Sequence, residues 1–171
     1  GLEKFTYPDF PALQHKDLKP NQSIIKVLQE KDIMLHFPYQ SFQYIIDLLR
    51  EASIDPKVSE IKMTFYRSAR YSNVVNALVN AARNGKKVTV FLEIQARFDE
   101  EANIVLANKL HYEGVKIVPT IPGFKVHSKL ILIKRQEGEI SQNIANISTG
   151  NFNESTARVY ADESLLTANQ E

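Results

Sequence analysis

Residues 58–94 read VSEIKMTFYRSARYSNVVNALVNAARNGKKVTVFLEI, and this stretch decides the fold. Residues 58–66 and 87–94 are rich in β-branched and aromatic side chains, which favour strands. Between them, Ser72 can cap a helix whose apolar residues recur at helical spacing, and Gly85 can end it. A strand, a helix and a second strand in this order predict a unit of two parallel strands joined by a helix.

Strand and helix signals alternate outward from this unit. Residues 33–36 predict a strand, and Ser41 can cap a helix with an apolar face. Asp99 can open a further helix that ends at Gly114, before a short strand at 115–118. The alternation predicts an α/β fold, with a mostly parallel mixed sheet flanked by helices on both faces.

The two ends of the chain depart from this alternation. Residues 126–133 predict a strand with an apolar core run, residues 144–148 its antiparallel hairpin partner, and residues 164–167 a last strand. Residues 1–31 form an irregular lead-in segment, broken by prolines, with one short helix. We therefore expect one domain at residues 32–171. Because the chain begins without a methionine, we expect it to be a fragment of a longer protein.

The composition excludes several classes of protein. A net charge of +1 offers no surface for binding a bulk polyanion, so no nucleic acid partner is expected. The chain has no cysteine, which excludes a disulfide framework and a thiolate zinc site. No apolar run has the length of a membrane span, and the N-terminus lacks the pattern of a signal peptide. These features favour a cytoplasmic location, and a peripheral position at the membrane stays open.

Polar side chains gather at one predicted edge of the sheet. In open α/β sheets, ligands bind beyond the carboxyl ends of the parallel strands. Arg67 follows one of these strands and Arg97 follows the next. An antiparallel strand would then start at this edge with His127, and its partner would return there with Asn151 and Asn153. We therefore predict that these residues converge on one anion site.

The sequence VHSK at residues 126–129 carries the candidate chemistry. In an extended strand alternate side chains share a face, so His127 and Lys129 should point the same way. A neutral imidazole beside an ammonium can act as a nucleophile next to a phosphate anchor. Gly150 lets the backbone approach a ligand, and the asparagines that follow it offer amide donors to phosphate oxygens.

Each of these side chains also has a structural interpretation. Arg67 and Arg97 could form solvated ion pairs, which contribute little stability. Lys129 could extend from a core strand to solvent, Tyr160 could be a packed aromatic residue, and the asparagines could be turn formers. No P-loop sequence is present, which excludes a P-loop mechanism.

Several stretches together are highly specific. They are residues 32–36 (DIMLH), 62–67 (KMTFYR), 96–100 (ARFDE), 126–129 (VHSK) and 149–153 (TGNFN), with Thr156, Arg158 and Tyr160. In these stretches the chain resembles the bacterial polyphosphate kinases that have phospholipase D-like catalytic domains. The resemblance covers residues 31–171 and corresponds to the first catalytic C-terminal domain of that family.

The resemblance implies an activity and a set of site residues. It implies that His127 is phosphorylated by ATP and that Tyr160 contacts the nucleotide. It places Arg67 and Arg97 at the phosphate and magnesium site, where an Arg meets Mg²⁺ only through shared phosphate oxygens because it has no acceptor lone pair. The complete set of substrate-binding candidates is Arg67, Arg97, Lys129, Asn151, Asn153 and Tyr160.

The implied reaction is the reversible transfer of the ATP γ-phosphate to inorganic polyphosphate through a phosphohistidine, with Mg²⁺ as cofactor. The resemblance also implies further domains of the same enzyme, and a homo-oligomer for the full-length protein. The chain has one H-x-K motif and no repeat, whereas phospholipase D-like sites are built from two such domains. We therefore expect half of an active site, and an isolated chain that does not make polyphosphate.

Two alternatives stay open. The first is a phospholipase D-type phosphodiesterase that also uses His127. Many such enzymes carry H-x-K-x-x-x-x-D, and Lys134 stands here in place of the aspartate, which weakens this alternative. The second is a non-catalytic module that binds phosphate and docks other domains.

Overall fold

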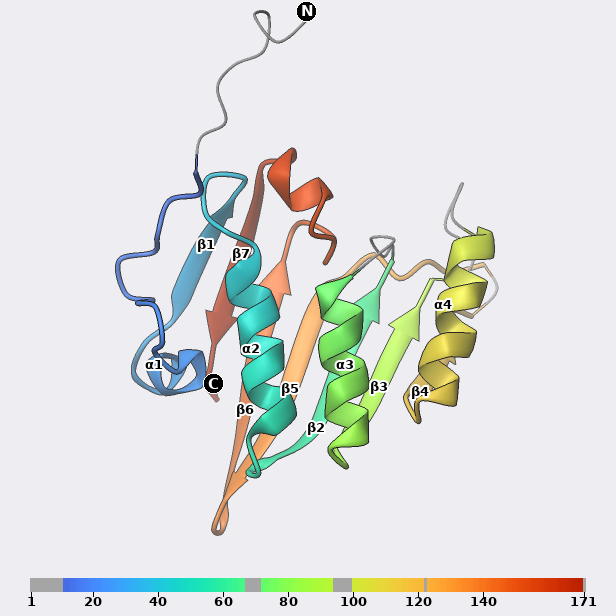
Figure 1. The fold of residues 1–171 in the computed structure, drawn as a ribbon, viewed down its shortest axis with the longest axis horizontal. Helices are drawn as coiled ribbons and strands as arrows, with labels where there is room; N and C mark the ends of the chain where they lie inside the picture. The colour runs from blue at the N-terminus through green and yellow to red at the C-terminus, as the bar shows by residue number, and fades with distance from the viewer. Residues whose placement is uncertain (1–10, 67–71, 94–99, 122, 171) are drawn as a thin grey trace, which may run out of the picture.

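The computed structural model describes residues 11–66, 72–93, 100–121 and 123–170, and Figure 1 shows its elements. They are α1 (Ile24–Glu30), β1 (Ile33–Phe37), α2 (Gln43–Ile54), β2 (Val58–Phe65), α3 (Asn73–Arg83), β3 (Lys87–Leu92), α4 (Glu100–Tyr112), β4 (Lys116–Pro119), β5 (Lys129–Glu137), β6 (Ile140–Ser148), the 3₁₀ helix η2 (Thr156–Arg158) and β7 (Asp162–Thr167). Among the described residues, no helix is long and apolar enough to span a membrane.

The strands form one mixed sheet in the order β1-β7-β6-β5-β2-β3-β4. The pairs β2–β3 and β3–β4 are parallel, and the other four neighbouring pairs are antiparallel. It follows that β1, β2, β3, β4 and β6 run in one direction, and β5 and β7 in the other. The predicted α/β fold with a mixed sheet is confirmed. Five of the seven strands of this sheet run in the same direction, but four of its six neighbouring pairs are antiparallel.

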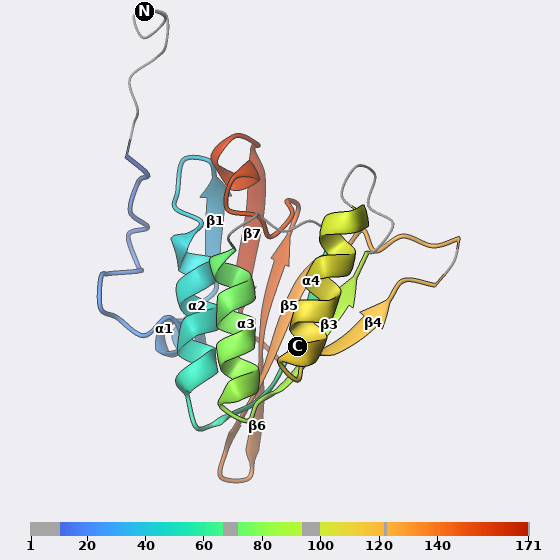
Figure 2. The same cartoon turned by 45° about the vertical axis from the view of Figure 1, so that its right-hand side comes forward.

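The prediction of helices on both faces is wrong for the part of the chain that the structure describes. Figures 1 and 2 show α2, α3 and α4 over the same face of the sheet. The connections from β1 to β2, β2 to β3 and β3 to β4 all cross the sheet in the same direction. Because such crossovers are right-handed, each connection places its helix on the same side.

The hydrophobic core lies between the sheet and these helices. Leu78 of α3 and Leu48 of α2 are fully buried, as are Ile61 of β2 and Ile131 of β5. Ser72 caps α3 as predicted, since its side chain accepts a hydrogen bond from the Val75 amide. The lead-in segment takes part in this packing, because residues of α1 belong to the same buried cluster.

The helix-free face carries a row of cross-strand neighbours. The row runs through Met34, Leu165, Ile147, Leu130, Thr64 and Phe91, from β1 across the sheet to β3. Four of its large apolar side chains are substantially exposed: Met34 and Ile147 at 51%, Phe91 at 41% and Leu130 at 37%. A continuous apolar row on one face is unusual for a surface exposed to water.

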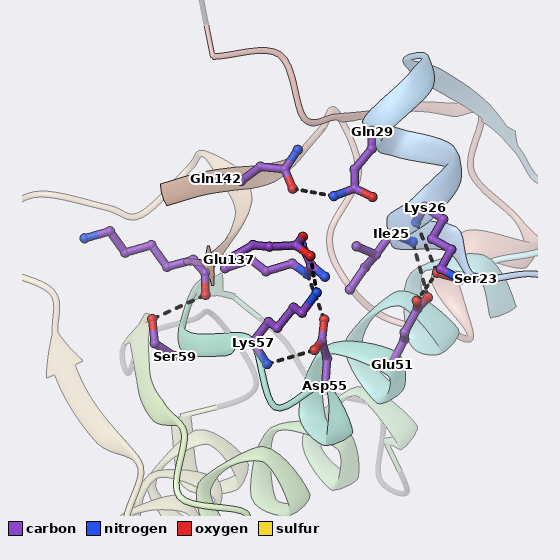
Figure 3. A network of polar contacts seen from close by, with 12 residues as sticks. Ser23, Ile25, Lys26, Gln29, Glu51, Asp55, Lys57, Ser59, Glu137 and Gln142 are labelled. Carbon is purple, nitrogen blue, oxygen red and sulfur yellow. Dashed lines mark hydrogen bonds and ion pairs between the residues drawn. The ribbon is translucent and has the colours of Figure 1, made fainter. Parts of the chain in front are cut away.

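A polar network near the β5–β6 hairpin joins this hairpin to the loop before β2 (Figure 3). The Arg135 guanidinium donates to Asp55 at 2.9 Å and to Glu137 at 2.7 Å. Lys57 forms a further ion pair with Glu137. The network lies at the far end of β5 from His127 and therefore supports the fold rather than the candidate site.

Candidate functional site

The strand ends meet as the sequence predicts, at what we call the site edge, where β2, β3 and β6 end and β5 and β7 begin. It lies at the top of Figure 1. Asn103 of α4, only 1% exposed, joins two of these ends. Its Nδ2 donates to the carbonyl oxygens of Tyr66 at 3.1 Å and Glu93 at 2.8 Å. Arg67 and Arg97 lie outside the described residues, so their positions stay a prediction.

His127 lies in a loop before β5, and not in the strand. The strand begins at Lys129, whereas the sequence predicted a start at residue 126. The reason is that side chains bind the backbone of this segment: Glu93 accepts from the Val126 amide, and Thr64 donates to the Ser128 carbonyl. The alternation argument for His127 therefore does not apply. His127 itself is exposed at the site edge.

Lys129 turns back toward the candidate nucleophile. Its Nζ donates to the carbonyl oxygen of His127 at 2.6 Å. Burial lowers the pKa of Lys129 below its ordinary value, and the negative charge of Asp162 partly offsets this effect. The ammonium group therefore lies beside the backbone of His127, as a positive charge at the site edge.

Gly150 leaves room for Asp162 on the neighbouring strand. A Cβ atom at Gly150 would lie 2.3 Å from the Oδ2 atom of Asp162. The other carboxylate oxygen of Asp162 accepts a hydrogen bond from the Thr149 hydroxyl at 2.8 Å. Sequence reasoning singled out Gly150 for close approach to a ligand and missed Asp162. The approach that the structure shows is that of the Asp162 side chain.

The two asparagines of the loop after β6 differ in their surroundings. The Oδ1 atom of Asn153, a residue only 6% exposed, accepts hydrogen bonds from the amides of Ser155 and Thr156. Asn153 therefore shapes the turn that leads into η2. The Oδ1 atom of Asn151 is buried and has no partner in the described structure. An unsatisfied buried acceptor is costly, so Asn151 is suited to meet a donor that arrives with a ligand or another domain.

Glu154 links this loop to α3. Its Oε1 accepts hydrogen bonds from the amides of Asn73 at 2.6 Å and Val74 at 3.3 Å, at the first turn of the helix. Glu154 therefore ties the loop after β6 to the start of α3. The sequence alone gave no signal for this contact. Tyr160, after η2, is 62% exposed and open to a ligand.

Two open pockets on the helix-free face flank the segment at residues 127–130. One has a volume of ≈ 580 Å³ and the other ≈ 520 Å³, and His127 lines both. The first also contains Lys62 and Lys125. Within the described ranges, no cluster of three His, Asp or Glu side chains could hold a metal ion. An Mg²⁺ ion that arrives bound to phosphate oxygens needs no such cluster.

Comparison with known proteins identifies the family to which the chain is similar. The model of the family described as polyphosphate kinase C-terminal domain 1 matches residues 23–171. The polyphosphate kinase of Escherichia coli is 51% identical over 170 residues, which cover 98% of this chain and 25% of that protein. That of Salmonella typhimurium is 48% identical over the same shares of the two chains.

Solved structures agree with this family. The crystal structure of polyphosphate kinase from Porphyromonas gingivalis has a TM-score of 0.81 and 48% identity, over 92% of this chain and 26% of that chain. A phospholipase D family member from Salmonella typhimurium has a TM-score of 0.61 at 18% identity, over 81% of this chain and 83% of that chain, which shows a common fold. The chain spans about a quarter of the length of its polyphosphate kinase relatives, and by the family match and these identities it belongs to the polyphosphate kinase family, as C-terminal domain 1.

Proposed function

We propose that this chain forms part of a polyphosphate kinase and carries the histidine that is phosphorylated during reversible transfer of the ATP γ-phosphate to polyphosphate. The observation that carries the proposal is the arrangement of the site edge in a chain of this family. Exposed His127, the Lys129 ammonium and the Asn151 loop meet there. ATP, ADP and polyphosphate are the proposed substrates, and the remaining domains of the enzyme are the proposed partners.

The reaction takes place in two displacements at phosphorus. A ring nitrogen of His127 attacks the γ-phosphorus of ATP, the bond from that phosphorus to the bridging oxygen breaks, and ADP leaves. A terminal oxygen of polyphosphate then attacks the phosphohistidine, and the nitrogen–phosphorus bond breaks. Such a loose transition state needs positioning and charge neutralisation more than covalent help from the protein.

The charges at the site edge suit this demand. Lys129 places an ammonium beside His127, and Arg67 and Arg97 are proposed to clamp phosphate oxygens in their planar forks. Mg²⁺ would be held through those same oxygens and would supply further positive charge. Tyr160 is proposed to contact the nucleotide. Asn151 is proposed to complete the phosphate contacts, with Asn153 shaping its loop.

The first prediction tests His127 in the intact enzyme. Replacement of His127 by Ala should abolish phosphoenzyme formation and polyphosphate synthesis, because no other nucleophile is proposed. The measurement is incubation with γ-labelled ATP, followed by a search for acid-labile, base-stable label at His127. The exposed position of the side chain means that the variant should unfold at the same urea concentration as the parent. Substantial synthesis by the variant would exclude the nucleophile role.

The phosphodiesterase alternative rests on the common fold and on the H-x-K motif at His127. The structure places Lys134, the residue that replaces the aspartate of many phosphodiesterases, exposed on β5. Hydrolysis of a phosphodiester by the intact protein without a nucleoside triphosphate would favour this alternative. Phosphate binding without any labelled histidine would favour the non-catalytic module.

A further inference from the structure

Both chain neighbours of His127 are held by side chains from other strands. The Val126 amide donates to Oε2 of Glu93 at 3.2 Å. On the other side, the Ser128 carbonyl accepts a hydrogen bond from Oγ1 of Thr64 at 2.8 Å. Within the described structure, no hydrogen bond or ion pair holds the His127 ring itself. The backbone between these two contacts therefore fixes the Cα position of His127 and the direction of its Cα–Cβ bond, from which the ring extends.

Glu93 is built to hold the loop before His127. It follows β3, is only 1% exposed, and its Oε1 accepts from the Thr120 hydroxyl at 3.2 Å. One carboxylate thus holds both ends of the connection at 120–126. Its own backbone is fixed as well, since its amide donates to Phe65 at 3.0 Å and its carbonyl accepts from Asn103 at 2.8 Å.

The chemistry of Glu93 sets it apart from a core-filling residue. Burial of a carboxylate costs free energy unless hydrogen bonds compensate it. An apolar side chain of similar volume would fill the same space at lower cost, but it could not accept the Val126 amide. The Glu93 carboxylate therefore does what an apolar side chain could not do here, because it accepts from both the Val126 amide and the Thr120 hydroxyl.

The Thr64 side chain links β2 to the chain of β5 beyond the point where backbone pairing between these strands ends. The last backbone pair between these strands is Met63 with Ile131. Beyond it, the Thr64 hydroxyl donates to the Ser128 carbonyl and accepts from the Leu130 amide at 2.9 Å. Valine has nearly the same shape and also favours strands. What threonine adds at this position is the hydroxyl, and with it the link to the segment that carries His127.

We propose that Glu93 and Thr64 are positioning residues for phosphoryl transfer. By fixing the backbone on both sides of His127, they set the reach of its ring nitrogen to the phosphorus that it attacks. This inference rests on the phosphohistidine function proposed above. A misplacement of about 1 Å can cost about 10²-fold in rate, because in-line attack depends on short and aligned contacts.

The test uses the intact polyphosphate kinase that contains this chain. The rate constant for His127 phosphorylation is measured in single turnovers with γ-labelled ATP, together with the KM for ATP. Thr64→Val should lower this rate constant by about 10- to 100-fold with little change in KM, since the phosphate contacts are untouched. Thr64→Ser keeps the hydroxyl and should stay within about threefold of the parent.

Glu93 is tested by a second matched pair. Glu93→Ala should lower the same rate constant by about 10²-fold. Glu93→Gln keeps an oxygen for the Val126 amide and gains a donor for the Thr120 hydroxyl, so it should restore most of the rate. Should Glu93→Ala fail to fold, the Thr64 pair decides, because Thr64 lies on the partly exposed helix-free face and valine suits a strand.

Two control variants distinguish a role in positioning His127 from a role in the stability of the fold. Thr89→Val makes the same change in β3, and Glu60→Gln alters another buried carboxylate, held by Lys62 and Lys87. Neither should change the rate constant per active site, whatever its effect on stability. If Thr64 or Glu93 served the stability of the fold alone, its replacement would reduce the fraction of enzyme that can be labelled, and the rate constant of the labelled fraction would stay unchanged.

Three outcomes would overturn the inference or its basis. A parental rate in Thr64→Val, or equal losses in Thr64→Val and Thr64→Ser, would remove the role of the hydroxyl. Equal losses in Glu93→Ala and Glu93→Gln would remove the assignment of Glu93. Label retained in His127→Ala would instead refute the proposed function itself, so the two failures are distinguishable.

Discussion

The Asp162 side chain occupies the space beside Gly150 in the candidate site. The backbone of Gly150 is outside the left-handed region, so the demand for glycine comes from space alone. A methyl group there would lie 2.3 Å from Oδ2 and 2.9 Å from Cβ of Asp162. Gly150→Ala should therefore displace the carboxylate from Thr149 and lower the free energy of unfolding by about 1–3 kcal/mol. Urea denaturation of parent and variant measures this difference.

The double variant supplies the control for this prediction. Asp162→Gly removes all the side-chain atoms that the new methyl group would meet, including Cβ. Gly150→Ala should then cost almost nothing in the Asp162→Gly background, because the two positions share one contact. Additive losses would show that Gly150 is needed for some other reason.

At this scale, the sequence points to the candidate site residues more readily than to the residues that hold them in place. His127 and Lys129 were found from a local motif, and the structure places both at the predicted edge. Glu93, Thr64 and Asp162 were not assigned these contacts, because each lies against a residue of a loop next to another strand, at least 12 residues away in sequence. Such pairs become visible only once strand order and register are known.

Among the elements, α3 depends on a cap from outside the helix. Glu154 accepts hydrogen bonds from the first amides of α3, where the helix dipole also favours a negative charge. Glu154→Ala should lower the free energy of unfolding by about 0.5–2 kcal/mol, as loss of a cap does. Glu154→Gln keeps an oxygen acceptor. Its free energy of unfolding in urea should therefore lie between that of the parent and that of Glu154→Ala.

A matched change elsewhere checks this assignment. Glu30→Ala removes an exposed carboxylate at the last residue of α1 and should leave the unfolding midpoint nearly unchanged. If Glu154→Ala lowered the free energy of unfolding no more than this control, the contact of Glu154 with the first amides of α3 would not contribute to stability.

The tip of the β5–β6 hairpin gives a prediction for pH. Hydrogen bonds from Lys57 and Arg135 lower the pKa of Glu137 from 4.5 to about 2. A carboxyl group whose pKa is lower in the folded state stabilises the fold above its ordinary pKa. This contribution is lost as the pH falls from 4.5 toward 2. The side chain is half exposed, so the effect should be small and should shrink with added salt.

Glu137→Gln should therefore flatten the dependence of the urea midpoint on pH in this range. Glu139→Gln, two residues away and exposed, serves as the matched control and should follow the parent curve. Parallel curves for the parent and Glu137→Gln would mean that the ion pairs of Figure 3 do not stabilise the fold.

Local elements were predictable because their signals are local. The cap at Ser72, the stop at Gly85 and the apolar periodicity between them predict α3, and the structure confirms it. The start of β5 was misplaced because residues 126–128 are bound by side chains of β2 and of the residue after β3 rather than by a neighbouring strand. The choice of one face for all three crossover helices follows from strand order, which no single element encodes.

For the molecule as a whole, the helix-free face has consequences in solution. Its row of apolar neighbours includes Met34 and Ile147, each 51% exposed. Contiguous apolar surface of this kind promotes association. The isolated chain should therefore self-associate as its concentration rises, and Met34→Lys with Ile147→Lys should shift it toward the monomer in sedimentation velocity.

Ile54→Lys tests whether the location of the charge matters. Ile54 is 73% exposed at the end of α2 and outside the row. Added charge there should leave the association of the chain unchanged. Equal shifts for both sets of variants would point to a general effect of net charge instead of the helix-free face.

The pairing of β1 with β7 sets an order on folding during synthesis. Met34 of β1 is paired with Leu165 of β7, so β1 can complete this pairing only after β7 has been synthesised. The unit β2–α3–β3 can form early from contacts near in sequence, but among the described strands β1 pairs with β7 alone, so this pairing waits until the ribosome has released β7. Until then the apolar residues of β1 are exposed to other chains. Slower synthesis of the C-terminal strands prolongs this interval, and chaperones that bind extended apolar segments would act on β1 during it.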